Sequence, residues 1–148
     1  MSTSSGGVSD LFPMWSPDGS TILFVSNRSG SNQLWTMNVD GGDQRQLTFD
    51  ATTKWQVPDW SPDGRHIAYQ ADNDIWVADA DGTNQVRLTA TTAVELGTAW
   101  APDGSKIAFA RGDTPAWSQV YVMNADGSDP HVVRATAERQ IVPAWQPF

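Results

Sequence analysis

The sequence predicts an all-β fold built from three imperfect copies of a unit of four short strands. The first observation is a turn motif, Trp-Ser-Pro-Asp-Gly at residues 15–19 and 60–64, which returns as Trp-Ala-Pro-Asp-Gly at 100–104. The second is the spacing of its tryptophans, which together with Trp145 lie 45, 40 and 45 residues apart. The third is hydrophobic periodicity: no segment has a convincing 3.6-residue period, so essentially no helix is expected.

Two further landmarks follow the turn motif in every unit. An aliphatic–aromatic pair ends in Trp35, Trp76 or Tyr121, and Asp-Gly pairs then occur at 40–41, 81–82 and 126–127. The first two units close with Leu-Thr at 47–48 and 88–89, whereas the third ends in Val-Val-Arg. Three landmarks in a fixed order at a period of 40 to 45 residues indicate a repeat architecture and not a chance match.

In the first unit we expect strands at Leu11–Trp15, Thr21–Ser26, Gln33–Asn38 and Gln44–Thr48. Ser-Pro-Asp-Gly suits the turn between the first two, because proline presets φ, aspartate suits the next position and glycine accepts the positive φ that follows. The second strand is rich in β-branched and aromatic residues. The other units repeat the pattern at Val57–Trp60, His66–Gln70, Asp74–Ala78 and Gln85–Leu88, and at Leu96–Trp100, Lys106–Ala110, Gln119–Asn124 and His131–Val133.

Four up-and-down strands at this period are typical of a β-propeller blade. The pattern Pro-x-Trp-Ser-Pro-Asp-Gly, Ile-x-Phe/Tyr, Leu/Ile-Trp, Asp-Gly and Leu-Thr resembles the TolB-like (PD40, WD40-like) repeat family over nearly the whole chain. We therefore expect a flexible lead-in at 1–10 and a partial propeller over 11–148. Its blades are expected at about 11–50, 56–90 and 96–135, with a surplus innermost strand at 140–148.

Three blades alone leave two apolar flanks uncovered, since a blade is covered on both flat faces only by its neighbours. Exposed apolar patches of that size mark an interface or an aggregation hazard. We therefore expect closure by self-association, with a head-to-tail homodimer of six blades as the simplest solution and the surplus strand as a candidate for swapping. The competing hypothesis is that the chain is a fragment of a longer propeller.

Composition excludes several classes of partner and chemistry. The net charge of −8 opposes binding to nucleic-acid phosphates and to anionic membrane surfaces. The chain has no cysteine, which excludes disulfides and thiolate chemistry. No segment approaches the apolar length of a membrane span, and the first eight residues lack the basic and apolar regions of a signal peptide.

Recurrence at one motif position indicates a structural role. The repeated tryptophans are expected to pack between blades, because aromatic side chains dominate core energetics: Trp15, Trp60, Trp100 and Trp145. The repeated turn aspartates are expected to accept hydrogen bonds from their own backbone and not to form a carboxylate ring: Asp18, Asp63 and Asp103.

No metal, cofactor or catalytic site is expected. The segments Asp79–Asn84 and Asn124–Asp129 lack the spacing and the distal glutamate of a calcium loop. The two histidines, His66 and His131, fall in different blades, and no nucleophile or phosphate-loop motif accompanies them. The sequence therefore predicts that the protein is not an enzyme.

A propeller has two rims, which differ here. The turn rim contains the turns between the first and second strands and between the third and fourth strands, and these turns are regular. The loop rim contains the other connections, which vary in length and chemistry between blades, as binding loops on a rigid scaffold do. Exposed tryptophan and arginine favour binding hot spots. The candidate binding residues on the loop rim are Asp10, Arg28, Lys54, Trp55, Glu95, Trp117 and Arg139. The alternative is that the two tryptophans cover the blades or fill an interface between chains.

The leading hypothesis is a non-catalytic binding or scaffold propeller that self-assembles head to tail and binds a protein, peptide or small ligand at its loop rim. One alternative is an engineered or fragmentary propeller with structural self-assembly and no ligand. The family resemblance implies another, a periplasmic or secreted TolB-like protein-interaction domain.

Overall fold

The structure is a computed structural model, and it describes residues 7–51, 53–54, 57–114 and 117–134. Within these ranges, twelve strands form three antiparallel sheets, each of four strands in chain order. The first sheet contains β1 (Asp10–Trp15), β2 (Thr21–Ser26), β3 (Gln33–Asn38) and β4 (Arg45–Gln46). The second contains β5 (Asp59–Trp60), β6 (His66–Ala71), β7 (Asp74–Asp79) and β8 (Val86–Arg87). The third contains β9 (Val94–Trp100), β10 (Lys106–Thr114), β11 (Trp117–Asn124) and β12 (His131–Arg134).

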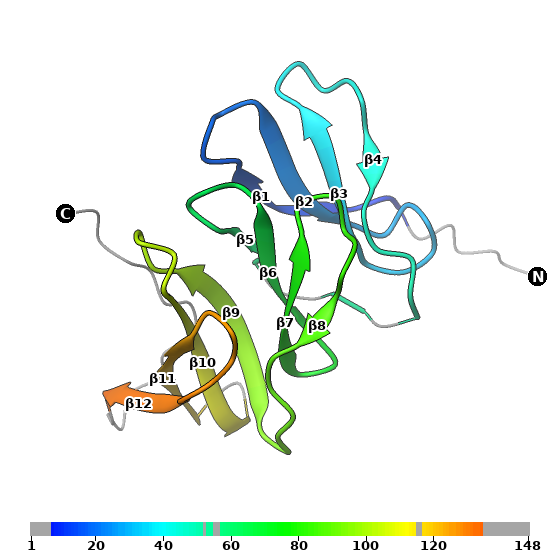
Figure 1. Cartoon of the computed structure of the whole chain (residues 1–148). Helices are drawn as coiled ribbons and strands as arrows, with labels where there is room; N and C mark the ends of the chain where they lie inside the picture. Colours follow the sequence, from blue (N-terminus) through cyan, green and yellow to red (C-terminus); the bar gives the residue numbers. More distant parts are fainter. Residues whose placement is uncertain (1–6, 52, 55–56, 115–116, 135–148) are drawn as a thin grey trace, which may run out of the picture.

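The sheets are arranged as consecutive propeller blades (Figure 1). The first strand of each sheet is innermost, since β5 lies against both β1 and β9. The all-β fold of three four-stranded sheets expected from the repeat is therefore present, and the described residues contain no helix. In particular, that part of the chain has no helix with the length and apolarity needed to cross a membrane. The surplus strand expected at 140–148 lies outside the described residues.

The turn motif folds through contacts within itself. In the first blade, Gly19 N donates to Ser16 O at 2.9 Å, and Gly19 has a φ of 71°, which glycine adopts without strain. The backbone N–H of Ser20 donates to Asp18 Oδ1 at 3.0 Å. Local chemistry therefore explains why this motif recurs wherever the first strand of a blade turns into the second.

The core lies between the blades and not within any one of them. At the first interface, apolar residues of two sheets interlock: Leu23, Val25, Leu34 and Leu47 contact Trp60, Ile67, Tyr69 and Ala78. At the second, the same arrangement contains Ala68 and Ile75 on one side and Trp100, Ile107, Phe109 and Met123 on the other. Because the later blade contributes equivalent positions at both interfaces, the packing repeats with the sequence.

The repeated tryptophans differ in exposure. Trp60 and Trp100 are each 8% exposed at the interface with the preceding blade. Trp15 occupies the same position in the first blade and is 60% exposed, because no described blade precedes it. Trp145 lies outside the described residues. The flank of the first blade that contains Trp15 is therefore an open version of a surface that the later blades bury.

Strand ends differ from the expectation where backbone pairing departs from the side-chain pattern. β4 and β8 have two residues each, because only those residues pair with the neighbouring strand, and β5 begins at Asp59 and not at Val57. In the third blade the hairpin continues beyond the strands expected at Lys106–Ala110 and Gln119–Asn124, with Arg111 opposite Gln119 and Gly112 opposite Ser118. Such pairing is independent of side-chain identity, so the sequence pattern did not indicate it.

Candidate binding site

Two clefts of the same construction open on the turn rim, one at each interface between blades. Cleft 1, of about 720 Å³, lies between the first and second blades, and cleft 2, of about 930 Å³, lies between the second and third. Each is lined by the turn motifs of both blades, by the outer strands of the earlier blade, and by the repeated tryptophan of the later blade. All of these lining residues belong to the described blades.

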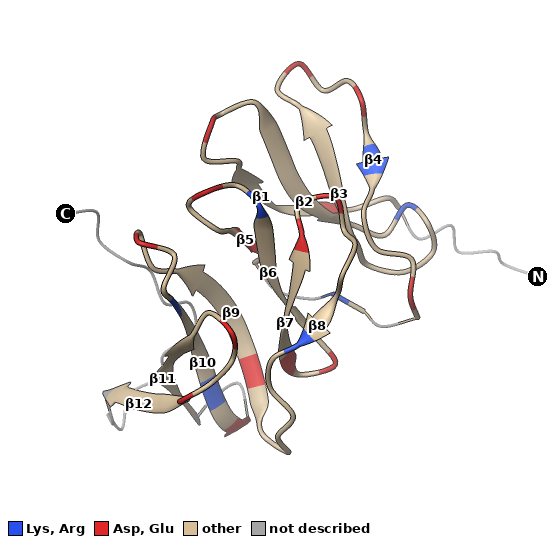
Figure 2. Cartoon of the chain, viewed as in Figure 1, with Lys and Arg blue, Asp and Glu red and all other residues tan. Residues whose placement is uncertain are grey.

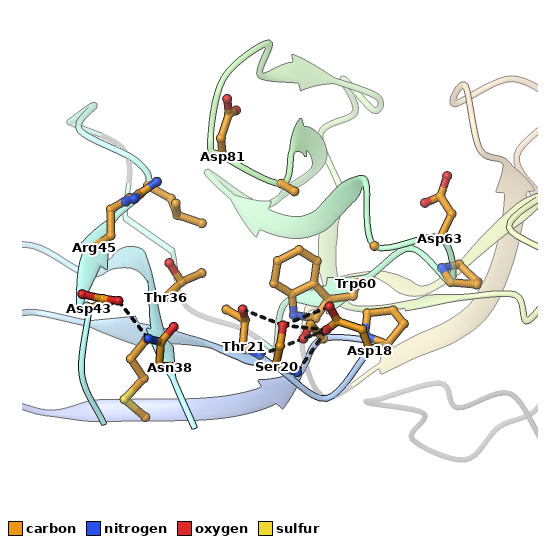
Figure 3. Close-up of a pocket in the computed structure, with 17 residues that line it drawn as sticks. Asp18, Ser20, Thr21, Thr36, Asn38, Asp43, Arg45, Trp60, Asp63 and Asp81 are labelled. Carbon is orange, nitrogen blue, oxygen red and sulfur yellow. Dashed lines mark hydrogen bonds between the residues drawn. The ribbon is translucent and has the colours of Figure 1, made fainter. Parts of the chain in front are cut away.

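The wall of cleft 1 is acidic (Figure 3). The view shows Asn38, Asp43 and Arg45 on one side, Asp18 and Asp63 on the other, Asp81 above and Trp60 between them. Asn38 Nδ2 donates to Asp43 Oδ2 at 2.9 Å. Figure 2 shows red segments at several of the turns between strands, and also within strands such as β9. The turn rim therefore presents negative charge around each cleft.

Hydrogen bonds within the turns keep these aspartates ionised. Ser16 Oγ donates to Asp18 Oδ1 at 2.6 Å, and this contact is the main reason that the pKa of Asp18 lies below its ordinary value. Ser61 Oγ bonds to Asp63 at the same distance and lowers the pKa of Asp63 in the same way. Asp81, Asp103 and Asp126 each accept hydrogen bonds from the residue two positions later in the chain, and these bonds also lower their pKa values.

Apolar side chains line the floor of each cleft. Trp60 and Leu47 lie in cleft 1, and Trp100 and Leu88 are their counterparts in cleft 2. The Nε1 atoms of both tryptophans are buried and have no hydrogen-bond partner among the described residues. A buried donor without a partner costs about 1–3 kcal/mol. Both atoms are enclosed by the protein, so a ligand acceptor could bond to either of them only after the indole shifts.

The two clefts differ at one equivalent position on the outermost strand. Cleft 1 has Arg45 on β4, whereas cleft 2 has Val86 on β8, with an exposure of 55%. Cleft 2 also contains His66, whose Nε2 lies 3.6 Å from Asp79 Oδ1. Cleft 2 is therefore both more apolar and less positive than cleft 1.

On the loop rim, three of the predicted binding residues occupy equivalent backbone positions, each opposite an equivalent residue of the second strand of its blade. The pairs are Asp10 with Ser26, Lys54 with Ala71, and Glu95 with Arg111. Each of the three side chains also has an ionic partner within the chain: Asp10 with Arg28 at 2.8 Å, Lys54 with Asp50 at 2.5 Å, and Glu95 with Arg111 at 2.7 Å. Asp10 and Arg28 thus come together as a pair, whereas Lys54 and Glu95 are buried in separate blades.

Arg111 is the residue of this rim that the sequence pattern did not identify. Its guanidinium lies 4.8 Å from the ring centroid of Tyr121 and 5.1 Å from that of Phe109. Arg28 covers an equivalent aromatic pair in the first blade. The repeat aligns Arg111 with Ser26 and Ala71, so nothing in the motif distinguished it.

The structure does not describe the side chains of the remaining predicted residues of the loop rim. Trp55 and Arg139 lie outside the described residues, and Trp117 begins β11 with a side chain that is not described. A ligand surface on this rim therefore stays a prediction. Among the described residues, no group of three or more histidine, aspartate or glutamate side chains is arranged to hold a metal ion.

Asp59 links two innermost strands and predicts a pH effect on stability. Its Oδ2 accepts the backbone N–H of Trp100 at 2.7 Å, and burial raises the pKa of Asp59 from 3.8 to about 6. The folded state then binds a proton more tightly than the unfolded state, so this group's contribution to stability falls as pH rises from about 4 to about 6. Asp59→Asn keeps an acceptor for Trp100 without the charge. We expect it to raise the free energy of unfolding at pH 7 by on the order of 2 kcal/mol.

Urea unfolding of the wild type and of Asp59→Asn at pH 4 and pH 7 measures this effect. The difference between the two proteins should be small at pH 4 and larger at pH 7. Taking the difference removes the contribution of the turn aspartates with lowered pKa values, which are common to both proteins and act in the opposite direction. A difference that does not change with pH would contradict the assignment.

Consecutive four-stranded antiparallel sheets with their core between them define a β-propeller protein. Residues 2–74 match the family model described as PD40, TolB beta propeller domain. A stretch of 94 residues is 37% identical to the Tol-Pal system protein TolB of Anaeromyxobacter dehalogenans and covers 61% of this chain and 21% of that protein. The crystal structure of TolB from Acinetobacter baumannii matches with a TM-score of 0.78 at 22% identity, over 99% of this chain and 37% of that one. The resemblance to the TolB-like (PD40) β-propeller repeat family is thereby confirmed.

A further relative is named a peptidase. A stretch of 56 residues is 48% identical to the uncharacterized peptidase YuxL of Bacillus subtilis and covers 37% of this chain and 8% of that protein. The chain thus spans about a fifth or less of the length of these curated relatives. These similarities establish that the chain shares repeat units with these relatives.

Proposed function

We propose that this chain is a non-catalytic protein-interaction module of the Tol-Pal type, working in the periplasm. The observation that supports the proposal best is the 94-residue stretch with 37% identity to a Tol-Pal system protein. The match to a peptidase covers only 8% of that protein, so it supports common blades and not common catalysis. The rigid blades present the acidic clefts of the turn rim as a surface that a partner protein contacts.

Binding to the purified Tol–Pal system proteins of Anaeromyxobacter dehalogenans tests the proposal by isothermal titration calorimetry. We expect one of them to bind, and expect the double variant Asp63→Asn/Asp103→Asn to bind more weakly, because asparagine keeps the turns while removing two charges from the clefts. Asp113→Asn, on the exposed end of β10 at the opposite rim, is the matched control. Binding by none of the proteins, or an equal effect of the control, would contradict the proposal.

A second proposal concerns closure of the ring by another copy of the chain. It is supported by the exposure of Trp15, which is 60% against 8% for its two equivalents. The open flank of the first blade has the same residue types that the second and third blades pack against the blade before them. The open face of the third blade repeats the positions that the first and second blades pack against the blade after them. The chain is thus self-complementary head to tail, and two copies give six blades, within the usual range.

Light scattering over a dilution series tests ring closure. We expect a species of twice the chain mass of 16.1 kDa, and its dissociation by Trp15→Glu. Phe49→Glu is the control, because Phe49 is 77% exposed on the other rim and has no part in closure. A wild-type monomer at every concentration would overturn this proposal and leave the open flanks to further blades of a longer chain.

A further inference from the structure

Cleft 2 combines an apolar floor with an acidic wall. Val86, Leu88 and Trp100 provide apolar surface, and Val86 is 55% exposed although it lies within a cleft. Four aspartates surround this surface: Asp63, Asp79, Asp103 and Asp126. Among the described residues, no lysine or arginine lines the cleft, and His66 already lies beside Asp79. An occupant with both apolar and positively charged groups would be complementary to this lining.

The spacing of the carboxylates favours separated positive charges over a single ion. Asp63 and Asp103 belong to the turn motifs of successive blades, while Asp126 lies on the outer turn of the third blade. These groups do not converge, and the described residues contain no cluster suited to a metal ion. Lysine or arginine side chains along an extended chain can reach such separated carboxylates one by one.

The indole of Trp100 provides a second, independent feature. It is 8% exposed, lines cleft 2 and has an Nε1 donor with no partner among the described residues. An extended peptide has a carbonyl acceptor at every residue, which polyamines and simple cations lack. The Nε1 atom is itself buried, so a peptide carbonyl can accept from it only after the indole shifts toward the cleft.

We propose that cleft 2 binds an extended peptide segment in which an aliphatic side chain is flanked by lysine or arginine. The aliphatic side chain covers Val86 and Leu88, and the flanking cations face the aspartates of the wall. This proposal rests on the protein-interaction function proposed above and names the chemistry of the partner segment.

Cleft 1 provides the internal control. Its walls repeat those of cleft 2, with Asp18, Asp43, Asp63 and Asp81, but Arg45 stands where cleft 2 has Val86. A positive charge at this position competes for the aspartates and repels a basic ligand. We therefore expect cleft 1 to bind such a peptide more weakly than cleft 2.

The test uses a fluorescein-labelled peptide, Lys-Ala-Leu-Lys-Ala-Lys, and its counterpart with glutamate for lysine, measured by fluorescence anisotropy. We expect binding of the lysine peptide alone, and a loss of affinity of roughly tenfold with Val86→Arg, equivalent to one or two ion pairs. Arg45→Val should add a second site of similar affinity. Asp126→Asn should weaken binding, whereas Asp40→Asn, at the equivalent turn of the first blade and outside both clefts, should not.

Each variant is first checked for an unchanged circular dichroism spectrum, and indole N–H resonances are followed by NMR. Equal binding of the two peptides, or unchanged affinity of Val86→Arg with a native spectrum, would overturn the proposal. A shift of the Trp100 indole resonance on titration would support it. If the peptide binds but no Tol–Pal protein does, the peptide-binding role of cleft 2 is supported and the proposed function is rejected. If a Tol–Pal protein binds but the peptide does not, only the peptide-binding role of cleft 2 is rejected.

Discussion

Glu95→Ala is expected to lower the free energy of unfolding by about 3 kcal/mol or more. The carboxylate of Glu95 is fully buried and bonds to Arg111 at 2.7 Å, and its other oxygen accepts from Thr89 Oγ1. The side chain of Arg111 is only 16% exposed, so removal of its partner leaves a guanidinium that water hydrates poorly. Urea denaturation at neutral pH measures the loss.

The first blade supplies a matched comparison for this prediction. Asp10 occupies the backbone position equivalent to Glu95 and pairs with Arg28, but its side chain is 49% exposed. Asp10→Ala should therefore cost less than about 1 kcal/mol. The double variant Glu95→Leu/Arg111→Met should recover much of the loss, because it removes both charges together. Equal losses at the two positions would show that burial does not determine the effect.

Gly82→Ala is expected to have the second large effect, a loss of about 3–4 kcal/mol from backbone strain and overpacking together. Gly82 has a φ of 86°, which side chains other than glycine rarely adopt. A β-carbon added there would overlap the carbonyl oxygen of Leu47 in the preceding blade. The turn and the blade interface would therefore both be disturbed.

The three blades contain equivalent glycines that separate the effect of backbone strain from that of the blade contact. Gly127 has the same φ of 86°, but an added β-carbon would lie 3.0 Å from Leu88 O, and at Gly41, with a φ of 84°, nothing lies within 4 Å. The losses should follow the order Gly82, Gly127, Gly41, with about 1–2 kcal/mol from strain alone at Gly41. Thermal melts at a dilution where the chain is monomeric measure this order. A loss at Gly41 as large as at Gly82 would contradict the role of the blade contact.

The repeat predicted most of the strands because each depends on local chemistry. β2 and β3 begin and end where the sequence pattern placed them, and the Ser-Pro-Asp-Gly turns close through bonds between residues two to five positions apart. The outer strands were predicted less well. β8 pairs through Val86 and Arg87 alone, and the extension of β10 beyond Ala110 depends on backbone pairing that any side chain permits.

The candidate site was not predicted, because it exists only between blades. Asp63 and Asp81 were correctly described as turn residues, yet packing of the blades makes them walls of a cleft. Val86 and Arg45 lie in short outer strands, and nothing in their local sequence distinguishes them.

By itself, the sequence determined the repeat, the four-stranded unit, the turn chemistry and the family, since all of these follow from residues close together in the chain. Only the tertiary structure decided which charged residues face solvent and which are buried. Glu95 lies 16 positions from Arg111, and the structure buries it in an ion pair with that residue. The difference arises because burial is a property of packed surfaces, and the packing partner of every blade here is another blade.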